Sequence, residues 1–361
     1  MNALHLDEQT GWRGGEQQAS WLIQGLAKRG HCVIIAGRPG SAFLSSDHGN
    51  AGVQKVALPL RGEFDFWSAW KLARIVRREN VDIIHAHSSH AHSIAVCARK
   101  LAGCGKVVVS RRVSFPPKDH ALNRWKYAQP DLIIAVSGKV GEVMREFGVP
   151  ESRLAVIHSS VDLSRLDVNP ISRAEIGVAA DALLLVSVGA LVGHKDHETL
   201  IMAMPQVLEH FPQARLIIAG EGELRPAIEA RIAALGLKNA VTLLGHRSDA
   251  PRLIRAADLY VSSSWSEGLG TSVLEALACE TPVVATVAGG VPEMVRPGET
   301  GYLVPSRDPA ALAAAIIKSL GNRDDAKIMA RHGRHLVEEF FLTERMVERT
   351  LSAYDTLLRQ G

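Results

Sequence analysis

Short apolar runs alternate with amphipathic stretches along almost the whole chain, and this alternation constrains the fold more than any other feature. The runs are continuously apolar, as expected for buried parallel strands, whereas residues 16–29 and 199–210 have the spacing of amphipathic helices. The expected strands are residues 2–6, 31–36, 81–85, 106–110 and 131–136, followed by 183–188, 214–219, 241–244, 258–261 and 282–285. This order favours βαβ units, so we predict an α/β protein with parallel sheets covered by helices on both faces.

The chain has 361 residues, which is long for a single core and favours two domains. The alternation breaks at residues 164–179, a polar and irregular segment. Each half retains enough units for its own doubly wound sheet, with ligands expected at the carboxyl ends of the strands. We therefore expect domains at residues 1–165 and 166–342, followed by an amphipathic helical segment, 343–361, that packs back on the first domain.

The net charge of +3 is too small to indicate a nucleic-acid partner. Basic residues are nevertheless concentrated between Arg99 and Lys126, where Asp119 is the one acid. Such a segment suits phosphates or peripheral contact with an anionic membrane, and an ordinary solvated surface is the alternative. The four cysteines form no CxxC pair and most lie in apolar surroundings, which predicts buried free thiols. With no signal segment and no spanning run, we expect a cytoplasmic protein, with any membrane contact at the inner face.

The segment 264–276 carries the most informative candidate site. It follows an expected strand, turns at glycines, and begins a helix for which Thr271 or Ser272 is an available N-cap. A helix N-terminus suits anions, because its amides are free and its dipole is positive there. Glu267 on the turn and Glu275 in the helix are placed to face one phosphorylated, polyhydroxylated ligand. The segment therefore predicts a nucleotide-sugar pocket.

Other strand-ending loops point to the same kind of ligand. Lys195 follows the strand at 183–188, where a cation can neutralise a diphosphate. Three further turns are ordinary when each is taken alone. Together they support a ligand site, because all lie at the carboxyl ends of expected strands. They are Gly14–Gly15, a candidate phosphate approach; Gly220–Glu221; and His246–Arg247, a candidate contact for base or ribose.

Four histidines lie within residues 85–92 and resemble a zinc-binding cluster. No carboxylate lies in that run, and His85 and His87 end an expected buried strand. We therefore favour His85 and His87 as lining of an acceptor pocket, with packing or solvated histidines as the alternative, and we expect no metal site.

Taken together, these residues resemble the family 4 retaining glycosyltransferases of the GT-B fold, also called group 1 glycosyltransferases. The resemblance covers nearly the whole chain and is strongest over residues 183–305. Its most specific element is the E-x7-E pair, Glu267 and Glu275. The supporting elements are Gly14–Gly15, residues 131–137, Lys195, residues 220–222 and residues 289–293.

The resemblance implies two Rossmann-like domains facing a cleft, the second binding the donor and the first the acceptor. It implies that Glu267 contacts the transferred sugar and that Glu275 holds the nucleotide ribose. Lys195 would stabilise the diphosphate leaving group, together with the donor-binding loop Gly268, Leu269, Gly270 and Thr271. No divalent metal or other cofactor would be needed.

Two positions depart from the family pattern. Ala190 replaces a frequent arginine, for which Arg13 or Arg247 are candidate substitutes, and Arg111–Arg112 stand near the place of a frequent histidine. A guanidinium is not a base, so Arg111 and Arg112 predict an anionic acceptor.

The sequence thus predicts a hexosyltransferase-type enzyme that moves a sugar, with retention, from a UDP-linked donor. The expected acceptor is a glycan or lipid-linked glycan in synthesis of a bacterial surface polysaccharide or lipopolysaccharide. The alternatives are a GT-B-fold sugar-nucleotide epimerase and a non-catalytic glycosyltransferase-like subunit. The absence of a GxGxxG motif disfavours a dehydrogenase. The sugar, the linkage and the oligomeric state stay open.

Overall fold

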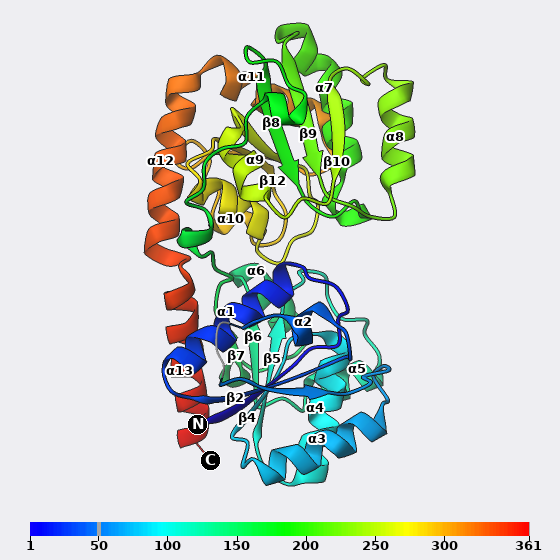
Figure 1. The fold of residues 1–361 in the computed structure, drawn as a ribbon, viewed down its shortest axis with the longest axis vertical. Coiled ribbons are helices and arrows are strands. Elements are labelled where there is room, and N and C mark those ends of the chain that lie inside the picture. The colour runs from blue at the N-terminus through cyan, green and yellow to red at the C-terminus, as the bar shows by residue number, and fades with distance from the viewer. Residues whose placement is uncertain (49–51, 361) are drawn as a thin grey trace. The chain divides into compact units, whose positions relative to one another are not determined.

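The computed structural model describes residues 1–48 and 52–360, and the chain forms two compact units (Figure 1). The first unit is Met1–Ser160 together with Thr343–Gly361, and the second is Val161–Leu342. The expected boundary between residues 165 and 166 lies slightly beyond the observed one. All four cysteines are unpaired, but Cys32 and Cys104 are exposed, so the expectation of burial was wrong for these two.

The first unit is built on a parallel seven-stranded sheet with the order β3-β2-β1-β4-β5-β6-β7. Its strands are β1 (Asn2–Leu6), β2 (Cys32–Gly37), β3 (Gln54–Ala57), β4 (Ile83–Ala86), β5 (Lys106–Arg111), β6 (Leu132–Ala135) and β7 (Leu154–Val156). Its helices are α1 (Gly14–Lys28), α2 (Ala42–Ser45), α3 (Phe66–Arg78), α4 (Ser89–Ala102), α5 (Ala121–Tyr127), α6 (Gly138–Glu146) and α13 (Thr343–Arg359).

Helices cover both faces of this sheet, as the apolar runs predict. One core joins α3 and α4 to side chains such as Leu4 and Ile84, and the other joins α1 and α13 to Ile35 and Val108. Helix α13 lies beside α1 (Figure 1). Gly25 makes this close packing possible, because a Cβ there would lie 2.4 Å from Val347 Cγ2.

The second unit is built on a parallel six-stranded sheet with the order β10-β9-β8-β11-β12-β13. Its strands are β8 (Leu183–Val188), β9 (Ala214–Ala219), β10 (Val241–Gly245), β11 (Leu259–Ser262), β12 (Val283–Thr286) and β13 (Tyr302–Val304). Its helices are α7 (His197–His210), α8 (Arg225–Ala234), α9 (Ala250–Ala256), α10 (Thr271–Ala278), α11 (Pro309–Gly321) and α12 (Arg323–Phe340). One core contains α7, α8 and α11, and the other contains α9, α10 and α12.

Each sheet reverses its strand order once, between β1 and β4 in the first unit and between β8 and β11 in the second. Loops leaving neighbouring strands diverge at such a switch point and leave a crevice at the carboxyl edge. The predicted α/β architecture of two doubly wound parallel sheets is therefore confirmed. Of the helices that the structure describes, none combines the length and the apolar character that crossing a bilayer requires.

Candidate functional site

The switch point of the second sheet brings the two predicted catalytic residues together. Lys195 ends a short 3-10 turn after β8, and Glu267 lies on the loop after the neighbouring strand β11. Lys195 Nζ donates to Glu267 Oε1 at 2.6 Å, and the two side chains are only 19% and 10% exposed. A cation and a carboxylate are thus held together in a largely desolvated place.

Hydrogen bonds between the two loops fix this pair. Ser264 Oγ donates to Glu267 Oε1 at 2.7 Å, and Ser263 Oγ donates to the carbonyl of Lys195 at 3.1 Å. Trp265 adds two bonds, from its backbone amide to the carbonyl of His194 and from Nε1 to the carbonyl of Gly193. Preorganised loops of this kind lose little entropy when a ligand binds.

Helix α10 begins beside Glu267, but its N-cap is Gly270 and not Thr271 or Ser272. Gly270 has a φ of +98°, a left-handed conformation that glycine adopts without strain, and the chain enters the helix through it. The amides of a first helical turn have no partner within the helix, so this end can receive an anion. Gly268 accepts a bond from Gly290 at 3.2 Å, and Leu269 is buried in the core, so Leu269 supports the loop by packing.

Glu275 lies on α10, and burial raises the pKa of its carboxyl to about 7, while the nearby Arg165 acts in the opposite direction. Tyr260 on β11 is fully buried and lies within electrostatic range of both Glu267 and Glu275, and burial raises its pKa as well. Its hydroxyl donates to the carbonyl of Val188 at 3.3 Å. Sequence reasoning treated Tyr260 only as part of an apolar strand, although a buried tyrosine hydroxyl needs a partner.

Gly220 and Glu221 shape the backbone beside the site. A Cβ on Gly220 would lie 1.8 Å from the carbonyl oxygen of Gly189, so only glycine allows the ends of β8 and β9 to approach this closely. Glu221 forms an exposed ion pair with Arg225 at 2.6 Å. In the part of the chain that the structure describes, this pair makes no hydrogen bond or ion pair with Lys195, so a donor role for Gly220 and Glu221 stays a prediction.

His246 and Arg247 follow β10 at the same edge of the second sheet. His246 is exposed, and Arg247 forms a two-bond ion pair with Asp249 at 2.7 and 2.8 Å. Arg247 can therefore substitute for the missing cation at Ala190 only by leaving Asp249. Their contact with base or ribose stays a prediction.

In the first unit, Gly14 and Gly15 form the first two residues of α1. A Cβ on Gly15 would lie 3.4 Å from Arg112 Cδ, and Arg112 Nη2 lies 3.0 Å from His87 Nδ1. The switch point between β1 and β4 thus gathers Gly15, His87 and Arg112, three of the predicted binding residues.

His85 and His87 belong to a buried polar network. His85 uses both ring nitrogens, Nδ1 with Tyr354 Oη at 2.5 Å and Nε2 with Ser110 Oγ at 2.8 Å. His87 Nε2 lies 2.9 Å from His5 Nδ1. Burial lowers the pKa of both His85 and His87 well below the usual range, so both are neutral.

This network engages His85 within the fold, so its expected acceptor role stays a prediction. The cavity beside His85 and Arg112 measures about 20 Å³, which is room for about one water. The ligand atoms of His5, His85 and His87 lie within 4.8 Å of one another. A metal ion there would have to displace the partners of His85 and lie beside the Arg112 cation, so the arrangement fits a hydrogen-bond network better.

Arg111 is also engaged within the fold, so its expected acceptor contact stays a prediction. Its side chain is buried, and its guanidinium donates to Tyr127 Oη at 3.0 Å and to the carbonyl of Phe115 at 2.5 Å. Lys126 is buried as well, and pairs with Glu63 at 2.5 Å. The expected basic segment 99–126 is therefore not one exposed face, because two of its cations hold the fold together.

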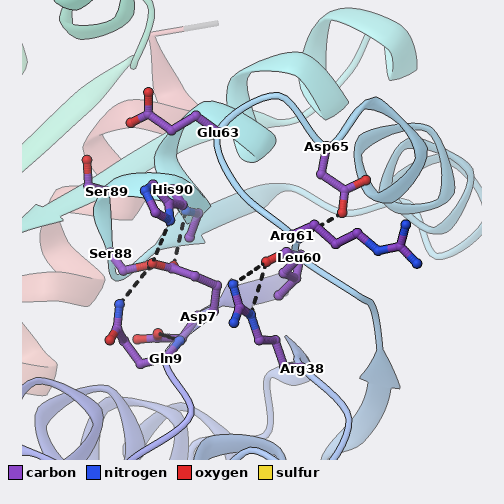
Figure 2. Close-up of polar contacts among 12 residues, drawn as sticks. Asp7, Gln9, Arg38, Leu60, Arg61, Glu63, Asp65, Ser88, Ser89 and His90 are labelled. Carbon is purple, nitrogen blue, oxygen red and sulfur yellow. Dashed lines mark hydrogen bonds and ion pairs between the residues drawn. The ribbon is translucent and has the colours of Figure 1, made fainter.

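Polar groups that the sequence reasoning missed lie at the same edge of the first sheet. Asp7 and Glu8 directly follow β1. Their place at the end of a strand could have identified them, because the same criterion identified the loops after β8 and β11. Burial raises the pKa of Asp7 to about 7, and Glu8 accepts a bond from Ser88. Figure 2 shows Asp7 and Gln9 beside Ser88 and His90, while Arg38 donates two bonds to the carbonyl of Leu60.

Comparison with known families agrees with this architecture. A family model described as Glycosyl transferases group 1 matches residues 168–336, and one described as Glycosyltransferase Family 4 matches residues 12–165. Together the two segments span most of the chain.

Characterised relatives cover nearly the full length. The chain is 26% identical over 350 residues to N-acetyl-alpha-D-glucosaminyl L-malate synthase of Bacillus anthracis, covering 92% of this chain and 91% of that protein. It is 27% identical over 346 residues to the lipopolysaccharide core biosynthesis glycosyltransferase LpsE of Rhizobium meliloti, covering 93% and 94%.

Solved structures show the same fold. Anabaena Alr3699/HepE in complex with UDP aligns with a TM-score of 0.85 at 22% identity, covering 99% of this chain and 100% of that one. Sucrose-phosphate synthase from Thermosynechococcus elongatus aligns with a TM-score of 0.84 at 21% identity, covering 100% of both chains. The chain therefore belongs to the group 1 glycosyltransferases of the GT-B fold, enzymes that take the transferred sugar from a nucleotide sugar.

Proposed function

We propose that this enzyme transfers a sugar from a UDP-linked donor to a glycan or lipid-linked acceptor in synthesis of a bacterial surface polysaccharide or lipopolysaccharide. Transfer proceeds with retention of the anomeric configuration, and without a divalent metal or another cofactor. One observation carries the proposal, namely the 2.6 Å contact between Lys195 and Glu267 at the switch point of the second sheet, beside the start of α10.

The pair prepares the site for a diphosphate. Without ligand, Glu267 neutralises a Lys195 ammonium that would otherwise be buried unpaired. A donor diphosphate is a competing partner for Nζ, and its arrival frees the Glu267 carboxylate to accept bonds from sugar hydroxyls. As the leaving group gains charge, Lys195 and the first-turn amides of α10 stabilise it. This pairing of cation and helix N-terminus supplies the positive charge that a metal ion would otherwise provide.

Glu275 has a separate task, because it lies on the helix and not on the loop. Its carboxyl, with a pKa raised to about 7, can accept bonds from the two hydroxyls of a ribose. Hydroxyl donors favour the ionised form, so nucleotide binding should lower this pKa.

The choice of UDP and of a surface glycan is supported by relatives. HepE was crystallised with UDP and with UDP-glucose, and the pneumococcal O-GlcNAc transferase GtfA with UDP and GlcNAc. LpsE acts in lipopolysaccharide core biosynthesis. A nucleoside diphosphate of the same chemistry therefore suits the pocket of this chain.

Arg112 supports an anionic group on the acceptor. Its guanidinium is held by His87, with the carboxyls of Asp7 and Glu16 in electrostatic range. Its Nε has no hydrogen-bond partner among the described residues, but it is buried beside a cavity of about 20 Å³, so an acceptor oxygen reaches it only if this cavity widens. Arg112→Ala should therefore weaken use of phosphorylated or acidic acceptors more than use of neutral ones.

The test uses purified enzyme in a chelator, with a panel of UDP-sugars and with soluble and lipid-linked acceptors. The proposal predicts UDP release that depends on acceptor, and a product whose new linkage has the anomeric configuration of the donor by NMR. Inversion, or a strict need for added Mg²⁺, would contradict it. Free UDP with an epimerised sugar in the absence of acceptor would support the epimerase alternative instead.

A further inference from the structure

Helix α3 of the first unit and the loop that leads into it expose several aromatic side chains. Phe64, Phe66, Trp67 and Trp70 are between 48% and 65% exposed. The opposite side of the helix is buried against α4 and the sheet, through Ser68, Ala69, Leu72, Ala73 and Val76. Large aromatics gathered on one exposed face are uncommon in a soluble domain and mark an interaction surface.

The same face is strongly basic. At 100° per residue, Lys71, Arg74, Arg77 and Arg78 share the exposed arc of α3 with the aromatic rings, and Phe66–Arg78 contains no acid. Lys71 Nζ lies 3.7 Å from the centroid of the Trp67 ring, and Arg74 Cζ lies 5.0 Å from that of Trp70. Each tryptophan therefore carries a cation directly above it.

The acids that flank α3 in the sequence have partners within the fold. Asp65 caps α3 by accepting from the amide of Ser68 at 2.9 Å, and Glu63 binds the buried Lys126. Glu79 pairs with Arg78 at 2.7 Å. Figure 2 shows Asp65 and Glu63 on the loop that leads into α3. These acids therefore leave Lys71 and Arg74 available to an external partner.

A second pairing of an aromatic ring with a cation lies on α4 and α5. Lys100 Nζ lies 4.7 Å from the ring centroid of Trp125, which is itself exposed. The ion pair of Glu63 with Lys126 ties α5 to the loop before α3. Aromatic rings with cations beside them recur across neighbouring elements, and this is the composition that lies at the level of lipid headgroups.

We propose that the aromatic–basic face, defined as Phe64, Phe66, Trp67, Trp70, Lys71 and Arg74, binds the surface of an anionic lipid bilayer. The rings enter the headgroup region while the cations pair with lipid phosphates. The face lies outside the segment 99–126 in which the sequence placed membrane contact. Membrane binding by this face goes beyond the proposed transfer reaction, because it requires neither donor nor acceptor.

The charge test is cosedimentation of the full-length protein with phosphatidylcholine vesicles, with and without phosphatidylglycerol. Binding should require phosphatidylglycerol and weaken at high salt. Lys71→Glu with Arg74→Glu should reduce partitioning at least ~20-fold. Lys327→Glu with Arg331→Glu, exposed positions on α12, make the same change in net charge and should leave binding intact.

The aromatic test compares two double variants that both remove exposed apolar side chains. Trp67→Ser with Trp70→Ser should reduce partitioning at least ~10-fold, whereas Ile328→Ser with Phe340→Ser on α12 should not. Circular dichroism verifies folding of each. Equal partitioning of all variants would overturn the proposal. It would also be overturned if the wild type proved to be a dimer that Trp67→Ser with Trp70→Ser abolished while vesicle binding stayed unchanged, since the face would then bind a second copy. Failure of glycosyl transfer would leave this binding result unaffected.

Discussion

Lys195 and Glu267 are 72 residues apart in the sequence, and their side chains meet at 2.6 Å. They meet because β8 and β11 are neighbours at the switch point of the second sheet, so that loops leaving both strands reach the same crevice. Ser264 Oγ donates to the Glu267 carboxylate, and Ser263 Oγ donates to the backbone carbonyl of Lys195. The ion pair is therefore positioned before a ligand arrives.

Removing either partner should impair the chemical step. Lys195→Ala and Glu267→Ala should each lower kcat at least ~100-fold, the scale of one lost transition-state donor. The double variant should lose much less than the product of the two, since the residues act as a unit. Arg231→Ala and Glu198→Ala break an exposed ion pair of 2.5 Å in the same unit and serve as controls. Near-normal kcat in Lys195→Ala would refute the assigned role.

Glu275 should make stability depend on pH. The folded protein keeps this carboxyl protonated up to about pH 7, whereas an unfolded glutamate ionises near 4.5. The folded state binds more protons in that window, so the contribution of Glu275 to stability falls as the pH rises from 4.5 to 7. Glu275→Gln removes this pH-dependent loss of stability, because a glutamine amide does not ionise. The Tm of the variant relative to wild type should therefore be higher at pH 8 than at pH 5, and an equal difference at both pH values would contradict the burial of this group.

Gly220 should be irreplaceable for steric reasons. A Cβ would lie 1.8 Å from the carbonyl oxygen of Gly189, which is backbone and cannot rotate away. Gly220→Ala should lower the free energy of unfolding by about 3 kcal/mol or more in urea titrations. Gly321, at the end of α11, has open space around its Cβ position, so Gly321→Ala should change stability by less than about 1 kcal/mol. Similar values for the two variants would show that the strand ends separate easily.

The hydroxyl of Tyr354 should stabilise the first unit through His85. Tyr354→Phe leaves His85 Nδ1 buried without its partner, which costs about 1–3 kcal/mol. Native-state hydrogen exchange of β4 should report this loss. Tyr302→Phe makes the same chemical change at a half-buried position of the second unit and should leave exchange in β4 unchanged.

Most of the strands follow from the sequence, and the exceptions have a common cause. The apolar runs do not predict β3, β7 or β13, and all three lie at the edges of their sheets. An edge strand is short and half-exposed, as the burial of Gln54–Ala57 and Tyr302–Val304 shows, so it needs no continuous apolar run.

The candidate site divides in the same way. The positions of Lys195 and Glu267 were predictable, because residues that follow neighbouring parallel strands lie at the same carboxyl edge of a doubly wound sheet. The burial of Arg111 was not, because it depends on Tyr127 and the carbonyl of Phe115, which local sequence does not reveal. The contact of His85 with Tyr354 was not predictable for the same reason, since Tyr354 lies 269 residues away on α13.

The central claim is that Lys195 binds the donor diphosphate without a metal ion. Isothermal titration calorimetry of UDP in the presence of a chelator tests it most directly, with wild-type enzyme and Lys195→Ala compared at the same ionic strength. We predict that wild type binds UDP in the chelator and that Lys195→Ala binds at least ~10-fold more weakly, as expected for loss of a charge-assisted bond. Equal affinities, or binding that appears only when Mg²⁺ is added, would contradict the claim.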